Sequence, residues 1–90
     1  MEKYPIAHYK LGNSGLFING GVLTITDSEC IVSYLKKEVV RLVLTEAKAE
    51  TIPSELFHEG IRLTDSKSSI DLYFLKSSKM CKQVKELFSI

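Results

Sequence analysis

The chain has 90 residues, with 12 Lys and Arg against 11 Asp and Glu and a formal net charge of +1. This length fits one domain around one core, and hydrophobic and charged fractions of 44% and 26% exclude a chain that is disordered throughout. The nearly balanced charge also argues against a nucleic-acid partner, because such binders usually carry a marked basic excess.

The first third of the chain predicts short strands separated by turns rich in glycine. "YPIAHYKLG" alternates from Ile6 to Tyr9 and ends at "GNSG", which predicts one short strand and a turn. The apolar "LFI" follows and is closed by "NGG", where the Asn-Gly pair predicts a tight turn. "GVLTIT", at 21–26, alternates again and is rich in β-branched residues, as strands are.

A first hairpin is predicted around Asp27, where the chain turns into the second strand, "CIVSYL". With a four-residue loop at 27–30, Ile25 faces Val32 and the apolar residues of both strands share one face. A polar break, "LKKE", then leads into "VVRLVL". Both faces of this third strand are largely apolar, so we expect it at the centre of a sheet or under a cover.

The segment 45–59 does not distinguish between helix, strand and loop. Its alanines and charged residues suit a helix, but Pro53 interrupts any long one. A short helical turn from Pro53 to Phe57 is compatible with the proline in its first turn, and Gly60 would end it.

A second hairpin is predicted in "GIRLTDSKSSIDLYFL". A four-residue loop at 65–68 pairs Leu63 with Ile70 on the apolar face. The same register places Arg62 opposite Asp71 on the other face, where opposite charges stabilise the pairing.

The last segment predicts an amphipathic helix at about 77–89, begun by Ser77 or Ser78. Its apolar positions recur with helical spacing and form one stripe: Met80, Cys81, Val84, Leu87 and Phe88. The lysines at 76, 79, 82 and 85 are expected in solvent. The segments together predict a mainly β fold with a C-terminal α-helix, as a small bent antiparallel barrel or two packed sheets closed by that helix.

The tripeptide Thr-Asp-Ser occurs twice, at 26–28 and at 64–66. Two carboxylates such as Asp27 and Asp65 could in principle bind a cation or perform acid–base chemistry. Each follows a predicted strand at the point of reversal, however, and Asp and Ser favour turns by hydrogen-bonding to nearby backbone groups. We therefore interpret both copies as hairpin turns.

Residues capable of chemistry are few. Cys30 and Cys81 lack the spacing of a zinc site, which favours two buried, reduced thiols. His8 and His58 lie in no metal-binding motif, and the chain contains neither a nucleophile elbow nor a phosphate-binding loop. We therefore expect no catalytic residue, no metal and no cofactor.

"GGVLTITDSECIVSYL" and the later "GIRL", "DLYFL" and "VKELF" together resemble the PH-like superfold, in particular GRAM and bacterial PH-like domains. The resemblance implies a single PH-like domain over 1–90, with a bent antiparallel barrel plugged at one end by the last helix. Such domains usually bind proteins, peptides or phosphoinositides. The segment that matches their basic phosphoinositide-binding loop, "YKLGNSGLF", offers only Lys10, which argues against specific phosphoinositide recognition.

The leading hypothesis is therefore a non-catalytic interaction module that binds a protein or peptide. The alternatives are a peripheral membrane adaptor for anionic lipid headgroups, and a small-molecule binder or enzyme with a site in the barrel mouth. One short basic group, Lys36, Lys37 and Arg41, is a candidate patch for an anion or a partner, against the alternative of a solvated loop.

The expected location is the cytoplasm, either free or at a membrane surface. The N-terminal "MEKYPIAHYK" does not resemble a signal peptide, and no run approaches the length of a spanning helix. Self-association is a further expectation left open, because an unpaired strand edge can pair with its own copy.

Overall fold

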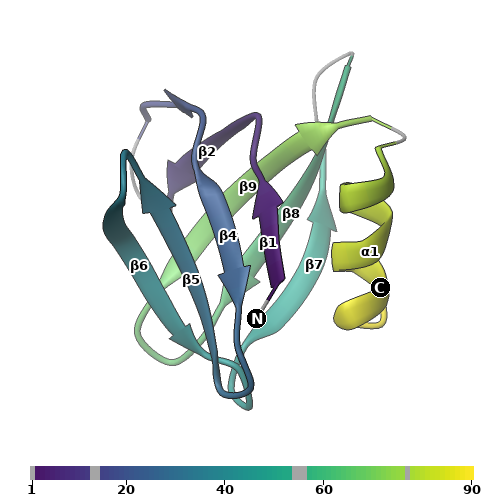
Figure 1. The fold of residues 1–90 in the computed structure, drawn as a ribbon. Helices are drawn as coiled ribbons and strands as arrows, with labels where there is room; N and C mark the ends of the chain where they lie inside the picture. The colour runs from purple at the N-terminus through teal and green to yellow at the C-terminus, as the bar shows by residue number, and fades with distance from the viewer. Residues whose placement is uncertain (1, 13–14, 54–56, 77) are drawn as a thin grey trace.

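The computed structural model describes residues 2–12, 15–53, 57–76 and 78–90. The described residues form nine strands and a C-terminal helix, arranged as two packed antiparallel sheets with the helix at one side (Figure 1). The predicted class, mainly β with a C-terminal helix, is confirmed. Of the two predicted arrangements, the structure has the two packed sheets.

Sheet A has the strand order β1-β4-β5-β6, and sheet B has the order β3-β2-β9-β8-β7. The strands of sheet A are β1 (Glu2–Pro5), β4 (Val22–Ile25), β5 (Glu29–Tyr34) and β6 (Lys37–Val43). The strands of sheet B are β2 (His8–Leu11), β3 (Ile18–Asn19), β7 (Lys48–Ile52), β8 (His58–Thr64) and β9 (Ser69–Leu75). Helix α1 (Lys79–Leu87) follows.

A bent pair of chain segments joins the two sheets. The pairing of β1 with β4 continues in the same register into the pairing of β2 with β3. At the corner, the N–H of Ile6 donates to the carbonyl of Gly21 at 3.0 Å, and the N–H of Gly20 donates to the carbonyl of Ala7 at 2.9 Å. Two of the sequence predictions are therefore wrong, because the first segment is two strands and "NGG" is a corner between sheets.

Two glycines at the corner explain why the strand pair bends from one sheet into the other. Gly20 and Gly21 have φ values of 99° and 112°, which side chains disfavour and glycine tolerates. They let this segment bend from one sheet into the other while its hydrogen bonds continue. An Asn-Gly pair thus marks a sharp change of direction, and here that change is a bend along a strand pair.

The first hairpin, β4–β5, turns more tightly than predicted. Ile25 faces Cys30 and not Val32, so the register is shifted by two residues. The Thr26 hydroxyl accounts for this shift, because its Oγ1 accepts the N–H of Glu29 at 3.0 Å. This bond closes the turn, so the loop is two residues shorter than predicted. The shift is even, so each side chain still lies on the predicted face.

The second hairpin, β8–β9, has the predicted register. Leu63 pairs with Ile70, and Arg62 pairs with Asp71. The Arg62 Nε donates to Asp71 Oδ1 at 2.8 Å, so the opposite charges meet directly across the strands.

Strands β6 and β7 lie at the outer edges of the two sheets. The expectation of a central or covered strand for "VVRLVL" is therefore wrong: Leu42 faces the core, whereas Arg41 and Val43 are exposed on the outer face. The undecided segment 45–59 contributes β7. The helical turn expected at 53–57 falls largely on residues outside those described.

The core lies between the sheets, and α1 covers the opening at one side (Figure 1). Ser78 is the N-cap, since its Oγ accepts the N–H of Cys81 at 3.1 Å, while Ser77 lies outside the described residues. Cys81 and Val84 are buried, and Met80 and Phe88 pack against the core from the same stripe. The amphipathic helix predicted from the sequence is confirmed.

Candidate functional site

The predicted basic patch lies partly at the turn between β5 and β6. Leu35 and Lys36 form this turn with φ values of 51° and 66°. A two-residue hairpin turn favours positive φ at both central residues, although residues other than glycine rarely adopt it. Leu35 is 78% exposed, and Lys36 and Lys37 are exposed beside it. The turn therefore presents a large apolar side chain next to two ammonium groups.

Arg41 lies apart from this turn, on the outer face of β6. Its guanidinium forms ion pairs with Glu29 at 2.5 Å and with Glu38 at 2.7 Å. Hydrogen bonding to Arg41 lowers the pKa of Glu38 below its usual value. Arg41 is thus neutralised by two carboxylates, and the two lysines carry the positive charge of the patch.

A groove of about 650 Å³ lies beside the turn, where the outer face of sheet A meets the corner between the sheets. We call it the lysine groove. Its lining combines two ammonium groups, polar side chains and bare backbone: Lys3, Asn19, Gly20, Gly21, Val22, Thr24, Ser33, Tyr34, Leu35 and Lys36. Within the described part of the chain, neither lysine forms an ion pair and none of the lining residues is acidic.

The outer face of sheet B carries a second feature, a cluster of rings that we call the ring face. His8 stacks on Tyr73 with ring centroids 4.6 Å apart, and His58 meets the edge of His8 at 4.7 Å. Phe17 contacts both His8, at 5.3 Å, and Tyr73, at 5.5 Å. These residues come from β2, β8, β9 and the segment just before β3.

Gly60 explains why the Tyr73 ring packs so closely against the backbone of sheet B. A Cβ at this position would lie 2.6 Å from Ile52 Cγ1 and 3.0 Å from Tyr73 Cε1. The ring and the Ile52 side chain therefore occupy the space that a side chain at position 60 would need. Tyr73 is only 7% exposed as a result and forms a firm base for the cluster.

A row of alternating charges crosses sheet B beside the rings. The carboxylate of Asp71, which is 2% exposed, lies 3.8 Å from the Lys10 ammonium and 2.8 Å from the Arg62 guanidinium. Arg62 also lies 3.8 Å from Glu50. Hydrogen bonding to Asp71 raises the pKa of Arg62. The row is therefore a set of paired charges in which the buried Asp71 carboxylate has cationic partners.

Exposed apolar side chains surround the ring face. Phe17 is 49% exposed, and Leu75, which pairs with His58 across the strands, is 59% exposed. Clustered exposed apolar and aromatic side chains are the usual mark of a protein-binding surface.

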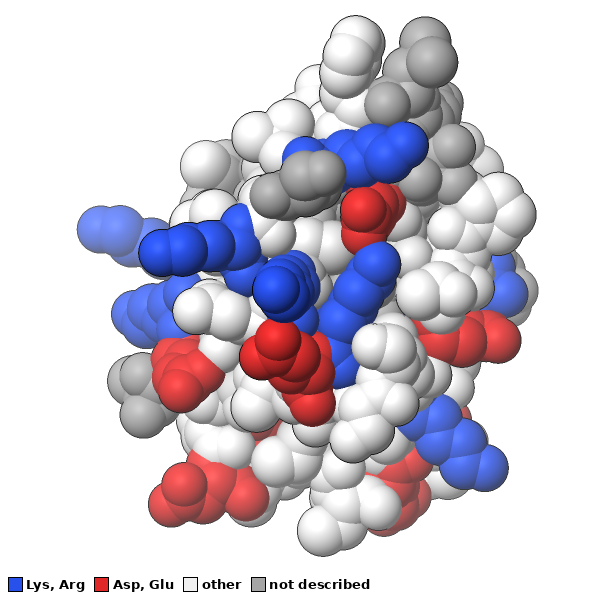
Figure 2. Space-filling view, turned by 90° about the vertical axis from the view of Figure 1, so that its right-hand side faces the viewer, with Lys and Arg blue, Asp and Glu red and all other residues white. Residues whose placement is uncertain are grey.

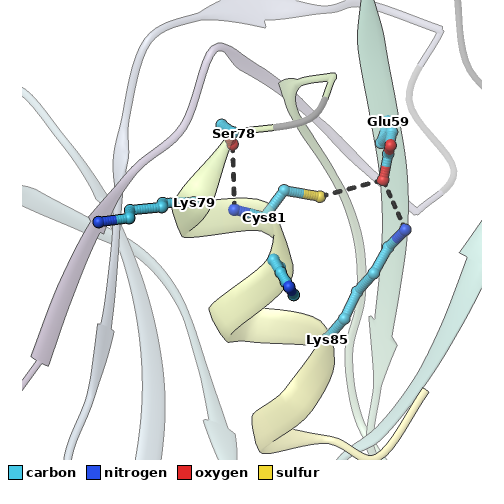
Figure 3. A pocket seen from close by; sticks show the side chains of 6 residues that line it. Glu59, Ser78, Lys79, Cys81 and Lys85 are labelled. Atoms are coloured by element: carbon cyan, nitrogen blue, oxygen red, sulfur yellow. Dashed lines mark hydrogen bonds and ion pairs between the residues drawn. The ribbon is translucent and has the colours of Figure 1, made fainter.

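The helix side of the molecule has a mixed charge. Figure 2 shows Lys and Arg side chains over its upper and middle parts, with Asp and Glu among them. A cavity of about 360 Å³ lies here, lined by Glu59, Ser78, Lys79, Cys81, Lys82 and Lys85. The Glu59 carboxylate accepts from the Lys85 ammonium at 2.5 Å and from the Cys81 thiol at 3.4 Å. Figure 3 shows both side chains reaching from α1 toward Glu59.

The two cysteines are buried, and burial affects the pKa of each thiol. Burial raises the pKa of Cys30 to about 11, and burial together with the Glu59 carboxylate raises the pKa of Cys81 to about 11. Both are free, buried thiols, as predicted. In the described part of the chain, no group of three or more His, Cys, Asp and Glu side chains is placed to hold a metal ion.

None of the described helices is long and apolar enough to cross a membrane. Comparisons of the chain with protein-family models, with curated proteins and with solved structures found no match.

Proposed function

We propose that the chain is a non-catalytic interaction module of the PH-like type that binds a protein or peptide through the ring face. The observation that carries this proposal is the group of exposed apolar side chains around a fixed aromatic base. Phe17 and Leu75 offer apolar contact area, and the buried ring of Tyr73 holds the cluster in position. Aromatic anchors of this kind supply much of the affinity of protein interfaces.

The order of the elements supports the PH-like part of the proposal. A bent strand pair shared by both sheets is followed by a meander, and the terminal helix covers the opening between the sheets (Figure 1). The resemblance stated from the sequence likewise implies antiparallel strands whose open end is closed by the last helix.

The surroundings of the thiols support the non-catalytic part. A nucleophilic cysteine needs a lowered pKa and access to solvent, whereas Cys30 and Cys81 are buried with raised pKa values. Reduced thiols also suit the cytoplasm, which we propose as the location.

Selection of binding peptides tests the proposal. We would display random twelve-residue peptides against the purified chain and measure the affinity of the enriched peptides for two variants. Phe17→Ser removes an apolar side chain from the ring face and should weaken binding at least tenfold. Leu87→Ser is the control, because Leu87 is 50% exposed, close to the 49% of Phe17, but lies on α1. Equal loss in both variants, or none in Phe17→Ser, would contradict the proposal.

A second candidate function is contact with an anionic membrane through the β5–β6 turn. The exposed Leu35 beside Lys36 and Lys37 favours it, because an apolar tip flanked by ammonium groups suits the surface of a charged bilayer. Vesicles of phosphatidylcholine with 30% phosphatidylserine test it by sedimentation. Binding that fails to weaken in Leu35→Ser, or that ignores salt, would argue against this function.

A further inference from the structure

We infer that the lysine groove binds an acidic peptide segment of a partner in an extended conformation. The groove lies at the outer face of sheet A, whereas the ring face lies on sheet B. The inference therefore adds a second contact surface with its own ligand chemistry to the proposed interaction module.

Charge is the first argument. Lys3 of β1 and Lys36 of the β5–β6 turn both line the groove. Arg41, by contrast, is neutralised by its pairing with Glu29 and Glu38. Two ammonium groups without a carboxylate in the described lining make the groove complementary to carboxylates, which lysine binds as a flexible point charge.

The floor of the groove is the second argument. Gly20 and Gly21 leave bare backbone there, and both are required by the corner between the sheets. A Cβ at Gly20 would lie 3.5 Å from Cε1 of Tyr34, another lining residue, so a side chain at position 20 would take up space beside that ring. A peptide backbone can therefore approach closely, as glycine-lined surfaces allow.

Polar side chains along the lining supply partners for such a backbone. Asn19 offers a donor and an acceptor, and Ser33 and Tyr34 offer hydroxyl groups. An extended segment carries a carbonyl and an N–H at each residue, so it can use these groups while its carboxylates reach the ammonium groups. The groove thus has one set of contacts for the peptide backbone and another for acidic side chains.

Shape favours a peptide over the other anionic ligands. A flat bilayer contacts a protruding feature such as Leu35, and it does not enter a hollow between a strand and a turn. A volume of about 650 Å³ is also far larger than a single phosphate ion requires, and it suits several residues of an extended chain.

Titration followed by ¹⁵N–¹H NMR tests the inference on the whole 90-residue chain. The probe is a ten-residue peptide of alternating Glu and Ser, and the matched control peptide has Gln in place of each Glu. We expect saturable shifts of the Gly20, Gly21 and Leu35 amides with the Glu peptide, weakening as salt rises, and none with the Gln peptide. The double variant Lys3→Gln/Lys36→Gln should bind at least tenfold more weakly.

The double variant Lys79→Gln/Lys82→Gln is the charge-matched control, because it removes two exposed lysines from α1, and it should bind within twofold of the unchanged chain. Loss of binding in this control, or shifts centred on α1, would overturn the inference. So would inorganic phosphate binding as tightly as the peptide, or phosphatidylserine vesicles causing the same amide shifts. Phe17→Ser should leave this binding unchanged, so failure here is distinguishable from failure of the ring face.

Discussion

At the scale of single residues, the two Thr-Asp-Ser sequences form their turns by different means. In the first copy the threonine closes the turn, since Thr26 Oγ1 accepts the N–H groups of Ser28 and Glu29. In the second copy the aspartate does so, since Asp65 Oδ1 accepts the N–H groups of Lys67 and Ser68 at 2.9 and 2.8 Å. The sequence predicted a hairpin turn at each copy, but it made the first loop two residues too long, and an identical tripeptide could not reveal which side chain closes each turn.

Asp65 has a second role that predicts a difference between the two aspartates. Its Oδ2 accepts the Val43 N–H at 3.3 Å, which links the β8–β9 turn to the end of β6 in the other sheet. Asp65→Ala should therefore lower the thermal midpoint clearly, whereas Asp27→Ala, in an exposed turn, should change it little. Thermal unfolding followed by circular dichroism measures both. Equal effects would show that the link between the sheets contributes nothing.

The pH dependence of this effect has a definite sign. Hydrogen bonds from the backbone, first that of Lys67, lower the pKa of Asp65. A lowered pKa in the folded state stabilises the fold above the unfolded pKa of about 3.9, and this stabilisation is lost as the pH falls through the folded value. The difference in thermal midpoint between Asp65→Ala and the unchanged chain should therefore be full at pH 7 and shrink below about pH 4.

Gly60 supplies a prediction about packing beneath the ring face. Gly60→Ala places a methyl group against Ile52 and Tyr73, and overpacking of this kind costs about 1–3 kcal/mol. Urea denaturation measures the loss. Adding Ile52→Ala removes the nearer obstacle, so Gly60→Ala should cost less in that background than alone. If the losses in free energy of unfolding from the two substitutions are additive, Ile52 does not restrict the space for a side chain at position 60.

At the scale of elements, hairpins and helix were predictable where their signals are local. The helix stripe and the pairing of Arg62 with Asp71 follow directly from spacing and charge. The position of β6 was not predictable, because an apolar strand at a sheet edge has the same sequence pattern as a central one. Its one arginine, Arg41, donates a hydrogen bond to Glu29, which lies 12 residues earlier in the sequence. The two residues meet only in the folded sheet, so the sequence does not indicate this pair.

The cap of α1 gives the prediction at this scale. Ser78→Ala removes the oxygen that accepts the Cys81 N–H and should destabilise the fold by about 1 kcal/mol, as for other helix caps. Ser28→Ala is the control, because the Ser28 hydroxyl makes no hydrogen bond to the described residues. Urea midpoints compare the two. A control as costly as the cap variant would disprove the capping role.

At the scale of the whole molecule, the candidate surfaces are products of sheet packing. The ring face joins His8, Phe17, His58 and Tyr73, which lie far apart in the sequence and meet only because β2 and β8 both flank β9. The lysine groove likewise joins β1 to a distant turn at a corner that the sequence did not predict. Of the candidate sites, the sequence could therefore predict only the local lysines at the β5–β6 turn.

The central claim is that the ring face is the principal contact surface. Mapping of amide shifts with a peptide selected on the unchanged chain tests it most directly. We predict that the largest shifts fall on His8, Phe17, Gly60 and Tyr73 and disappear in Phe17→Ser, while amides of α1 stay unchanged. Shifts centred on α1 or on the outer face of sheet A, with Phe17→Ser binding as before, would contradict it.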